Sequence, residues 1–346
     1  MSDAATIPGQ DATCLIVVPT LNESQNLPHL LDALIIEAEA LGARIVVADG
    51  GSTDGTADIA NNYAARSPHV VFIKNGRRIQ SAAMNLAVAT FGEACRYVIR
   101  IDAHGYYPAD YCRRLVAEAE RTGAGGVVVP MLTVGRGIFQ RAVANAQNSL
   151  VGTGGSSHRT GKTAGWVDHG HHALMRIDAY RTVGGYDEDF RYNEDAELDH
   201  RLGAAGWRIW LTDATLMVYF PRSTPAALFR QYFGYGGGRA RNLLKHRTIP
   251  RVRQVLPLAI LPAVALTGLA LVSWLAVVPL LAWSLLCIGM GTLAATRSRH
   301  QYRLPLLYAP LAGLAAMIMH FAWSSGFWLH VAGSASRHGK ASQWPA

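Results

Sequence analysis

Four short apolar runs, each followed by a longer segment with helical periodicity, dominate the N-terminal third of the chain. Strands that alternate with helices are joined by right-handed crossovers, which place the strands parallel in one sheet. The pattern therefore predicts an α/β fold with a mainly parallel sheet. The expected strands are 14–18, 44–49, 69–75 and 97–105, and the expected helices are 26–41, 57–66, 81–91 and 110–123.

Polar side chains follow three of these strands at the point where each strand ends. Asn22-Glu23 follows the first, Asp49 to Asp54 follow the second, and Asp102 to His104 close the fourth. Ligands of parallel α/β sheets bind at the carboxyl ends of the strands, which share one edge. The three groups therefore predict a single site. For Ser52 and Asp54, the alternative is that they cap helices or form turns.

Asp102-Ala103-His104 carries one carboxylate and one imidazole two positions apart. At the end of a strand these side chains would share a face. Together they can hold Mn²⁺ or Mg²⁺ if the phosphates of a substrate supply the remaining oxygen ligands. The alternative is that they are only the polar end of a strand, and their position beside the other two groups favours the metal.

A second acidic group lies far along the chain, after the turn at Gly184-Gly185. Asn193 is expected to cap a helix that carries acids in its first turn, namely Glu194, Asp195 and Glu197. Acids in this position complement the helix dipole, which is a sufficient explanation for Glu197. A carboxylate held near the edge of the sheet can also deprotonate the hydroxyl group of an acceptor.

Two further polar segments have weaker patterns. GGSSHRTGKT, residues 154–163, has five residues between Gly155 and Gly-Lys-Thr where a phosphate-binding P-loop needs four, so we expect a mobile loop that folds over the substrate. His169, His171 and His172 cluster without the ligand spacing of a zinc site. These histidines either form hydrogen bonds to a sugar or phosphate or simply pack within the fold.

The charge distribution divides the chain near residue 238. Of its 32 Lys and Arg residues, 11 lie in 239–346, which holds no Asp or Glu, so the net charge of +8 belongs to this part. No charged residue interrupts 255–296, a length that suffices for two membrane spans at about 20 residues each. The tail is thus too apolar for a nucleic-acid-binding arm and predicts a membrane partner. The expected spans are 255–275, 277–296 and 305–331.

The remaining features predict how the chain is organised around the membrane. The 4 cysteines lack paired spacing, and the N-terminus lacks a secretory signal, which favours a reduced cytosolic domain. Residues 226–235 fit an amphipathic interfacial helix, and the basic residues that follow it place this side in the cytoplasm. We expect a flexible N-terminus (1–11), an α/β domain (12–222), an interfacial segment (223–254), a membrane region (255–332) and a C-terminal tail (333–346).

Five segments closely resemble, in order and spacing, the family 2 inverting glycosyltransferases with a GT-A fold. They are VVPTLNES, VADGGSTDGT, RIDAHG, the GGYDE turn and NEDAELDHRL, and the resemblance covers about residues 12–240. The Asp-Ala-His variant and the acid-free tail are most similar to the succinoglycan-type exopolysaccharide transferases, the ExoA-like group. The resemblance implies a Rossmann-like GT-A domain facing the cytoplasm, followed by C-terminal helices in a multi-pass arrangement in a bacterial inner membrane.

The resemblance also implies roles for individual residues. Asp102 would hold the metal, with His104 in place of the last aspartate of the family's DxD motif. Glu194 and Asp195 match the family's ED motif, in which Asp195 is the general base. His171, Arg239 and Arg241 are expected at the phosphates of the acceptor, with lipid headgroups as the alternative for the two arginines. The implied nucleotide-sugar site comprises Pro19, Thr20, Asn22, Glu23, Asp49, Ser52, Asp54, Arg77 or Arg78, Asn85 and Asp102.

The reaction implied by the resemblance is transfer of a sugar from a nucleotide-sugar, with UDP-hexose favoured, to a lipid-linked saccharide acceptor in exopolysaccharide biosynthesis. Asp195 would take the proton of the acceptor hydroxyl in a single inverting displacement, while Mn²⁺ or Mg²⁺ offsets charge on the departing diphosphate. The acceptor would be carried on a polyprenyl diphosphate. Gln231 does not begin a strict QxxRW motif, because the sequence continues Tyr-Phe-Gly, and this argues against a processive synthase. Other polysaccharide-assembly enzymes are further candidate partners.

Other functions are less well supported by the residues. A dolichyl- or polyprenyl-phosphate sugar synthase-like transferase is the principal alternative. A nucleotide-binding membrane protein without transferase activity, such as a transporter, is disfavoured because the spans hold few polar residues and no second half repeats the pattern. A nucleotidyltransferase would require a Gly/Arg/Lys signature where this chain has PTLNES.

Overall fold

The computed structural model describes residues 13–154, 163–250, 252–298 and 304–341. The chain divides into two compact units. Unit 1 comprises Met1–Met131 and Gly161–Tyr219, and unit 2 comprises Leu132–Thr160 and Phe220–Ala346. The predicted flexible N-terminus (1–11), nearly all of the predicted mobile loop and the end of the tail lie outside the described residues.

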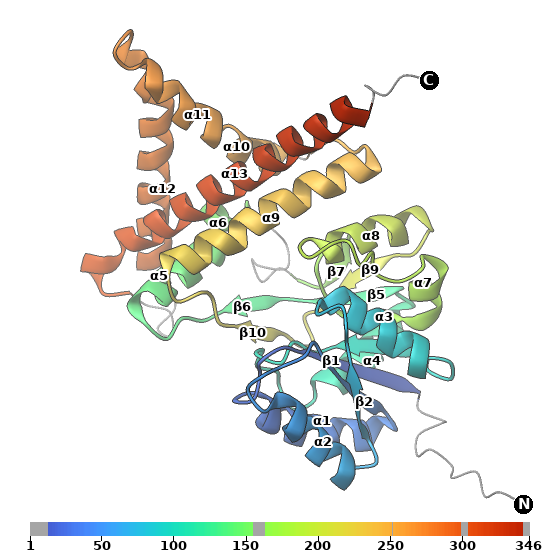
Figure 1. The fold of residues 1–346 in the computed structure, drawn as a ribbon. Coiled ribbons are helices and arrows are strands. Elements are labelled where there is room, and N and C mark those ends of the chain that lie inside the picture. The colour runs from blue at the N-terminus through green and yellow to red at the C-terminus, as the bar shows by residue number, and fades with distance from the viewer. Residues whose placement is uncertain (1–12, 155–162, 251, 299–303, 342–346) are drawn as a thin grey trace, which may run out of the picture. The chain divides into compact units, whose positions relative to one another are not determined.

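Unit 1 is built on an eight-stranded sheet with the order β3-β2-β1-β4-β8-β5-β9-β7 (Figure 1). Strands β1 to β4 pair in parallel, as do β5 and β9, whereas β8 and β7 run antiparallel to their neighbours. The predicted α/β fold with a mainly parallel sheet is therefore confirmed. The strands are β1 Cys14–Thr20, β2 Arg44–Asp49, β3 Val70–Lys74, β4 Tyr97–Arg100, β5 Gly126–Val129, β7 Gly165–Val167, β8 His171–Arg176 and β9 Ile209–Leu211. The short strands β6 (Met131–Thr133) and β10 (Met217–Tyr219) form a separate pair.

Helices cover both faces of this sheet. Because side chains alternate along a strand, β1 sends Ile16 to one face and Leu15 to the other. The first face packs on α1, α2 and α4, and the second on α3, α7 and α8, so that the sheet lies between two buried apolar layers. The helices are α1 Leu27–Leu41, α2 Thr56–Arg66, α3 Gln80–Phe91, α4 Tyr111–Thr122, α7 Ile177–Thr182 and α8 Glu194–Ala204.

Strand β4 is shorter than the sequence predicts. The expected strand reaches Gly105, but β4 ends at Arg100 and a turn follows, in which the Gly105 amide donates to the Asp102 carbonyl at 2.9 Å. The Tyr107 hydroxyl accepts from the Asp102 amide at 2.9 Å and lies 3.2 Å from its carbonyl oxygen, and so holds the turn. Asp102 and His104 therefore do not alternate on a strand, and their side chains are 18% and 54% exposed, respectively.

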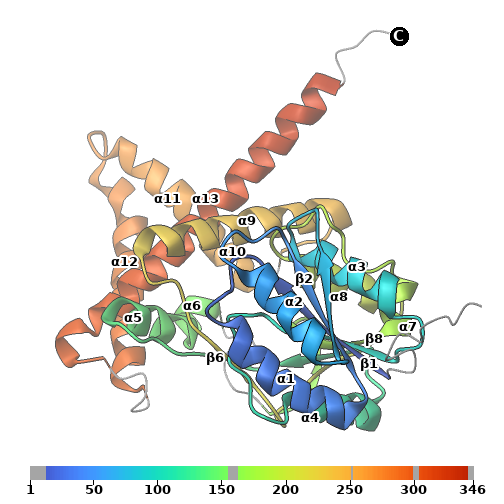
Figure 2. The ribbon, with the colours of Figure 1, turned by 60° about the horizontal axis from the view of Figure 1, so that its bottom comes forward.

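Unit 2 is helical and includes Leu132–Thr160, a segment that the sequence places in the α/β domain. The physical reason is burial: Val143 and Ala146 of α5 pack with Leu228 of α9 and Met319 of α13 in one apolar cluster. Helices α9 and α13 lie side by side (Figures 1 and 2). The helices are α5 Ile138–Gln147, α6 Leu150–Thr153, α9 Pro225–His246, α10 Val252–Leu258, α11 Ile260–Leu266, α12 Val278–Thr296 and α13 Pro310–Ala341.

Two stretches among the described residues are long and apolar enough to cross a membrane, Trp274–Thr296 and Leu306–Ser334. They overlap the expected spans 277–296 and 305–331. The expected span 255–275 is not one long helix. Pro257 lies inside α10, and α10, α11 and a short 3₁₀ turn follow one another in an apolar stretch, Gln254–Leu269, that is shorter than a bilayer crossing.

Helix α9 extends well past the interfacial helix expected at 226–235 and runs through Gly236–Gly238. The glycines are accommodated because α13 approaches the backbone of α9 closely. A Cβ atom on Gly236 would overlap the Trp323 carbonyl oxygen, and one on Gly326 would overlap the carbonyl oxygen of Phe233. Small residues allow helices to pack at short distance, so these glycines serve the contact between the two helices.

Gly236→Ala is expected to destabilise the protein by about 1 to 3 kcal/mol, because the added methyl group must displace backbone atoms of α13. Gly237→Ala is the matched control, since the nearest atom to its added Cβ is the Gly326 oxygen at an ordinary 3.6 Å. Alanine also has the higher helix propensity, so the control should keep or slightly raise the Tm. Thermal unfolding of the detergent-solubilised protein measures both, and equal Tm values would contradict the close packing.

Candidate active site

The loops after β1 and β2 are bound to each other through Asp49. Its carboxylate accepts hydrogen bonds from the Gly51 and Ser52 amides, both at 2.9 Å, from the Ser52 hydroxyl at 2.5 Å and from the Thr20 hydroxyl at 3.1 Å. Asn22 has a left-handed conformation, with φ 57°, and its backbone amide donates to the Ser52 hydroxyl at 2.8 Å. These polar groups build the loop pair, and their predicted contact with a nucleotide stays a prediction.

Asp54 and Pro19 also have structural positions at this edge. The Asp54 carboxylate accepts from the Ser24 amide at 3.0 Å and from the Thr56 hydroxyl at 2.5 Å, at the start of α2. These hydrogen bonds, that of Thr56 first, hold the pKa of Asp54 below its usual value. Asp54 thus has the turn-forming role that the sequence left open. Pro19 lies within β1, opposite Ala48 of β2.

Arg100, at the end of β4, is the centre of the polar cluster. Its side chain is only 3% exposed, and its Nη1 and Nη2 atoms lie 2.6 and 3.2 Å from the two carboxylate oxygens of Asp195. Its Nε atom lies 3.5 Å from Asp102 Oδ1, and Nη2 lies 3.1 Å from His171 Nδ1. One buried guanidinium therefore brings together the turn after β4, the start of β8 and the first turn of α8.

Arg100 is not among the site residues predicted from the sequence. The available signal was a single arginine inside the apolar run YVIRI, at a position where a strand covered on both faces leaves a cation no access to water. Gln80, at the start of α3, was also missed; its Nε2 atom donates to Asp102 Oδ1 at 2.6 Å. No motif in the sequence marks this glutamine.

The two neighbouring acids of α8 are held in different protonation states. Burial alone would raise the pKa of Asp195, but Arg100, His172 and His171 outweigh burial and hold this pKa far below its usual value. Burial and the adjacent charge of Asp195 raise the pKa of Glu194 to about 7. At neutral pH Asp195 is therefore ionised, whereas Glu194 is present in both its protonated and its ionised form.

Helix α8 begins at Glu194, and Asn193 precedes it as the sequence predicts. Asn193 has a left-handed conformation, with φ 61°, and its side chain does not cap the helix. Glu197 is fully buried and pairs with Arg201, whose Nη2 atom lies 2.6 Å from its Oε2 atom. The charge of Glu197 is thus balanced by Arg201, one helical turn away. The helix dipole, which the sequence suggests as the explanation, is an additional contribution.

Asp102 and His104 offer one carboxylate and one imidazole, donor types that Mn²⁺ can bind together with oxygens of a diphosphate. Burial alone would raise the pKa of Asp102, but Arg100 and His171 lower it and keep the carboxylate ionised. His104 Nδ1 lies 3.0 Å from Glu23 Oε1, and a carboxylate that accepts a hydrogen bond from Nδ1–H leaves the lone pair of Nε2 for a metal. Among the described residues, no three His, Cys, Asp or Glu side chains converge on one point, so phosphate oxygens would complete the coordination.

Asn85, which the sequence predicts near the nucleotide, is hydrogen-bonded within the fold, and its contact with a nucleotide stays a prediction. Its Nδ2 atom donates to the Tyr186 carbonyl and to Glu188 Oε1, both at 2.9 Å, and its Oδ1 atom accepts from the Tyr186 amide at 2.9 Å and the Tyr180 hydroxyl at 2.5 Å. Four hydrogen bonds use the whole capacity of an amide. Asn85 therefore fastens α3 to the turn that leads to α8.

The remaining predicted arginines lie at three places. Arg77 Nη1 is 2.9 Å from Glu188 Oε2. Arg78 has φ 57°, and its guanidinium lies against Gly51, where an added Cβ would be 3.3 Å from its Nη2 atom. Arg239 and Arg241 lie on α9 in unit 2, and their contact with an acceptor stays a prediction.

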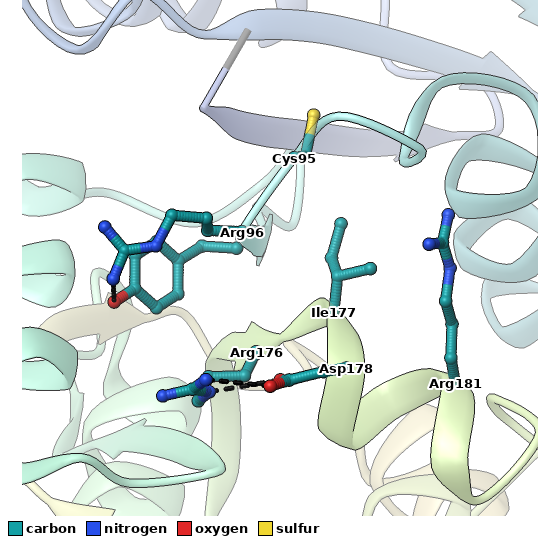
Figure 3. A pocket seen from close by; sticks show the side chains of 7 residues that line it. Cys95, Arg96, Arg176, Ile177, Asp178 and Arg181 are labelled. Atoms are coloured by element: carbon teal, nitrogen blue, oxygen red, sulfur yellow. Dashed lines mark hydrogen bonds and ion pairs between the residues drawn. The ribbon is translucent and has the colours of Figure 1, made fainter.

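Unit 1 also holds a pocket of about 300 Å³, shown in Figure 3. Its lining comes from the start of β4 and the end of β8, whereas Arg100 and His171 lie at the other ends of the same strands. Arg176 in this pocket is paired with Asp178, with Nη2 and Oδ2 2.7 Å apart. The pocket is therefore separate from the candidate active site.

Comparison with known proteins identifies the family. Residues 15–184 match the family model described as glycosyl transferase family 2. The chain is 56% identical to the succinoglycan biosynthesis protein ExoA of Rhizobium meliloti (strain 1021) over 314 residues, which are 91% of this chain and 93% of that protein. The chain belongs to glycosyl transferase family 2. This transferase is therefore an enzyme of the family that its five sequence segments indicate.

More distant relatives agree with this assignment. The transferase is 25% identical, over 60% of its length and 76% of the relative, to the N-acetylglucosaminyl-diphospho-decaprenol L-rhamnosyltransferase of Mycobacterium tuberculosis (strain ATCC 25618 / H37Rv). It shares the fold of the mannosyltransferase PcManGT from Pyrobaculum calidifontis, solved in complex with GDP-Man and Mn²⁺, with a TM-score of 0.55 and 20% identity over 89% of this chain and 86% of that one. The predicted GT-A fold is confirmed.

Glu194→Gln is expected to remove a pH-dependent loss of stability. The pKa of Glu194 in the folded protein, about 7, exceeds its usual 4.5, so the folded state holds the proton more tightly than the unfolded state does. This contribution is complete below pH 4.5 and is lost as the pH rises through 7. Relative to wild type, the variant should gain about 3 kcal/mol between pH 4.5 and pH 8.

Chemical unfolding at a series of pH values measures this difference. Glu39→Gln, on the exposed face of α1, is the matched control. The same pH response in both variants would contradict the burial of Glu194 beside an ionised Asp195.

Proposed function

We propose that this family 2 enzyme is a membrane-associated inverting glycosyltransferase of exopolysaccharide assembly. In this proposal it moves a hexose from a UDP-sugar to a saccharide carried on a polyprenyl diphosphate. The observation that carries the proposal is the Asp195 carboxylate, which Arg100 keeps ionised within a cluster that also holds Asp102. The extensive similarity to a succinoglycan biosynthesis protein supports the polysaccharide product.

The hydrogen bonds of Asp195 indicate which oxygen acts as the base. Oδ1 accepts from Arg100 Nη1 at 2.6 Å and from the Tyr186 hydroxyl at 3.0 Å, whereas Oδ2 accepts the longer bond from Arg100 Nη2, at 3.2 Å, and lies 3.8 Å from His171 Nδ1. Oδ2 therefore retains a lone pair for the acceptor hydroxyl. The side chain is 14% exposed, which leaves it a limited opening toward a substrate.

The ion pair with Arg100 also affects the timing of proton transfer. A carboxylate with a lowered pKa is a weak base, so it takes the proton only after the hydroxyl has become acidic through attack on the anomeric carbon. The hydroxyl oxygen forms the new bond from the face opposite the diphosphate, the bond from the anomeric carbon to the diphosphate breaks, and Asp195 receives the proton. Opposite entry and departure invert the anomeric configuration.

A divalent cation, Mn²⁺ or Mg²⁺, fits the proposed donor side of the site. Asp102 and His104 would hold it, and when bound it would offset the negative charge of the leaving diphosphate. Glu23 orients the His104 ring through Nδ1, and Gln80 fixes Asp102 through Oδ1. These two contacts are the part of the metal site that the chain builds in advance.

The lipid-linked acceptor is supported by the apolar helices of unit 2 and by the relatives. Leu281, Leu285 and Leu286 of α12 are more than half exposed, as expected of a lipid-facing surface. The mycobacterial relative is an N-acetylglucosaminyl-diphospho-decaprenol L-rhamnosyltransferase. A relative from Pseudomonas savastanoi pv. phaseolicola (strain 1448A / Race 6), 40% identical over 31% of this chain and 32% of that protein, is an undecaprenyl-phosphate 4-deoxy-4-formamido-L-arabinose transferase. In the proposal the catalytic unit faces the cytoplasm, where nucleotide-sugars are made.

Asp195→Asn is expected to lower the rate of sugar transfer by about 10² to 10⁴-fold, the usual contribution of a general base. Membranes that contain the enzyme are incubated with UDP- and GDP-sugars, and transfer to lipid-linked and to water-soluble acceptors is measured. Asp110→Asn, on the surface at the start of α4, is the control. The proposal fails if Asp195→Asn keeps the wild-type rate, or if soluble acceptors react as fast as lipid-linked ones.

His104→Ala is expected to raise the Mn²⁺ concentration required for half-maximal activity by roughly tenfold or more. Glu23→Gln should have the same effect to a smaller degree, because it removes the carboxylate that orients the ring. Titration with Mn²⁺ and Mg²⁺ measures both, with His29→Ala on α1 as control. An unchanged metal dependence in His104→Ala would show that Asp102 and the diphosphate hold the metal without this histidine.

A further inference from the structure

Behind Asp195 lies a chain of buried polar groups that the proposed reaction does not use. The Tyr186 hydroxyl lies 3.0 Å from Asp195 Oδ1 and 2.8 Å from His172 Nδ1. His172 Nε2 lies 2.5 Å from Asp199 Oδ1, and Asp199 Oδ2 lies 2.7 Å from His169 Nδ1. Tyr186, His172 and Asp199 are each at most 3% exposed.

These side chains come from three elements. Asp195, Tyr186, His172 and Asp199, together with the backbone of α8, form a closed ring of contacts. Asp195 and Asp199 are four residues apart on α8, so their carboxylates lie on the same face of the helix. His172 reaches this face from β8, and Tyr186 reaches it from the turn that Asn85 fastens. The histidine and the tyrosine together bridge the two carboxylates.

The direction of each hydrogen bond follows from the ionised state of Asp195. A carboxylate can only accept, so the single proton of the Tyr186 hydroxyl points to Asp195 Oδ1. The tyrosine oxygen must then accept from His172 Nδ1, while His172 Nε2 donates to Asp199. His172 thus donates from both ring nitrogens as an imidazolium. In agreement, Asp199 and Asp195 raise the pKa of His172 even though burial alone would lower it.

Packing alone does not account for this ring. Burying charged groups is costly, and well-packed apolar residues of similar volume usually stabilise a core as well or better. What the ring adds is orientation. Tyr186 and Arg100 both bind Oδ1, and this prevents rotation of the carboxylate that would exchange the two oxygens.

We propose that Tyr186 and His172 are positioning residues for the catalytic base, which hold Oδ1 of Asp195 so that Oδ2 faces the acceptor hydroxyl. In this arrangement, Asp199 sets the His172 ring so that Nδ1 faces Tyr186. The inference rests on the proposed role of Asp195 as the general base.

A double-mutant cycle tests the inference. Tyr186→Phe removes only the hydroxyl, and His172→Gln removes the double donor. Each is expected to lower kcat roughly 10- to 100-fold while the KM for the donor sugar changes less than threefold, because the carboxylate loses its orientation and not its substrate. In an Asp195→Asn background neither substitution should lower kcat further, since the group on which both act is gone.

Tyr111→Phe is the matched control, because Tyr111 is an equally buried tyrosine in the other core of unit 1. It should leave kcat unchanged. If Tyr186→Phe or His172→Gln lowers kcat as much in the Asp195→Asn background as in wild type, the positioning role is wrong. If Asp195→Asn itself has the wild-type rate, the proposed function fails instead, so the two failures are distinguishable.

Should one substitution prevent folding, as judged by Tm, the other completes its own cycle with Asp195→Asn. A loss of kcat that persists in that cycle would overturn the inference, and its disappearance would support it.

Discussion

The buried guanidinium of Arg100 is the interaction on which the rest of the site depends. A cation at the end of a covered strand is tolerable only if anionic oxygens surround it, and Asp195 and Asp102 meet this demand from two different segments. The same contacts fix the charge states, because Arg100 holds Asp195 ionised and Asp195 in turn drives its neighbour Glu194 toward the neutral form. Removing either acid would leave a buried cation only partly compensated, so the geometry of the base cannot be separated from the stability of the fold.

Most of the fold of unit 1 could be predicted because its signals are local. Apolar runs that alternate with helical segments place β1 to β4 and α1 to α4 within a few residues of their observed bounds. The prediction was wrong where a distant contact decides the outcome. The Tyr107 hydroxyl holds the turn that follows β4, and α9 continues through its glycines at the place where α13 packs closely against it. The expected span 255–275 is a different case, because the apolar helical stretch that contains Pro257 ends at Leu269 and is too short to cross a bilayer.

The candidate site shows the same division. Asp102, His104 and Asp195 could be identified from the sequence because they occupy recognisable segments. Arg100 and the ring of Tyr186, His172 and Asp199 could not, since their roles come from strands and helices that meet only in the folded chain. Asp49 and Asp54 lie at the predicted edge of the sheet. Much of their hydrogen-bonding capacity, however, is used within the loops themselves. Position in a motif thus predicts where a residue lies better than what it binds.

The amide of Asn85 has a consequence for how this enzyme can change over time. Its four hydrogen bonds join α3 to the segment that carries Tyr186, although the two positions are 101 residues apart. A side chain of different shape at position 85 would move the tyrosine as well as the helix end. Positions 85, 180 and 186 are therefore expected to vary together among descendants of this sequence, as a linked set whose members cannot be exchanged one at a time.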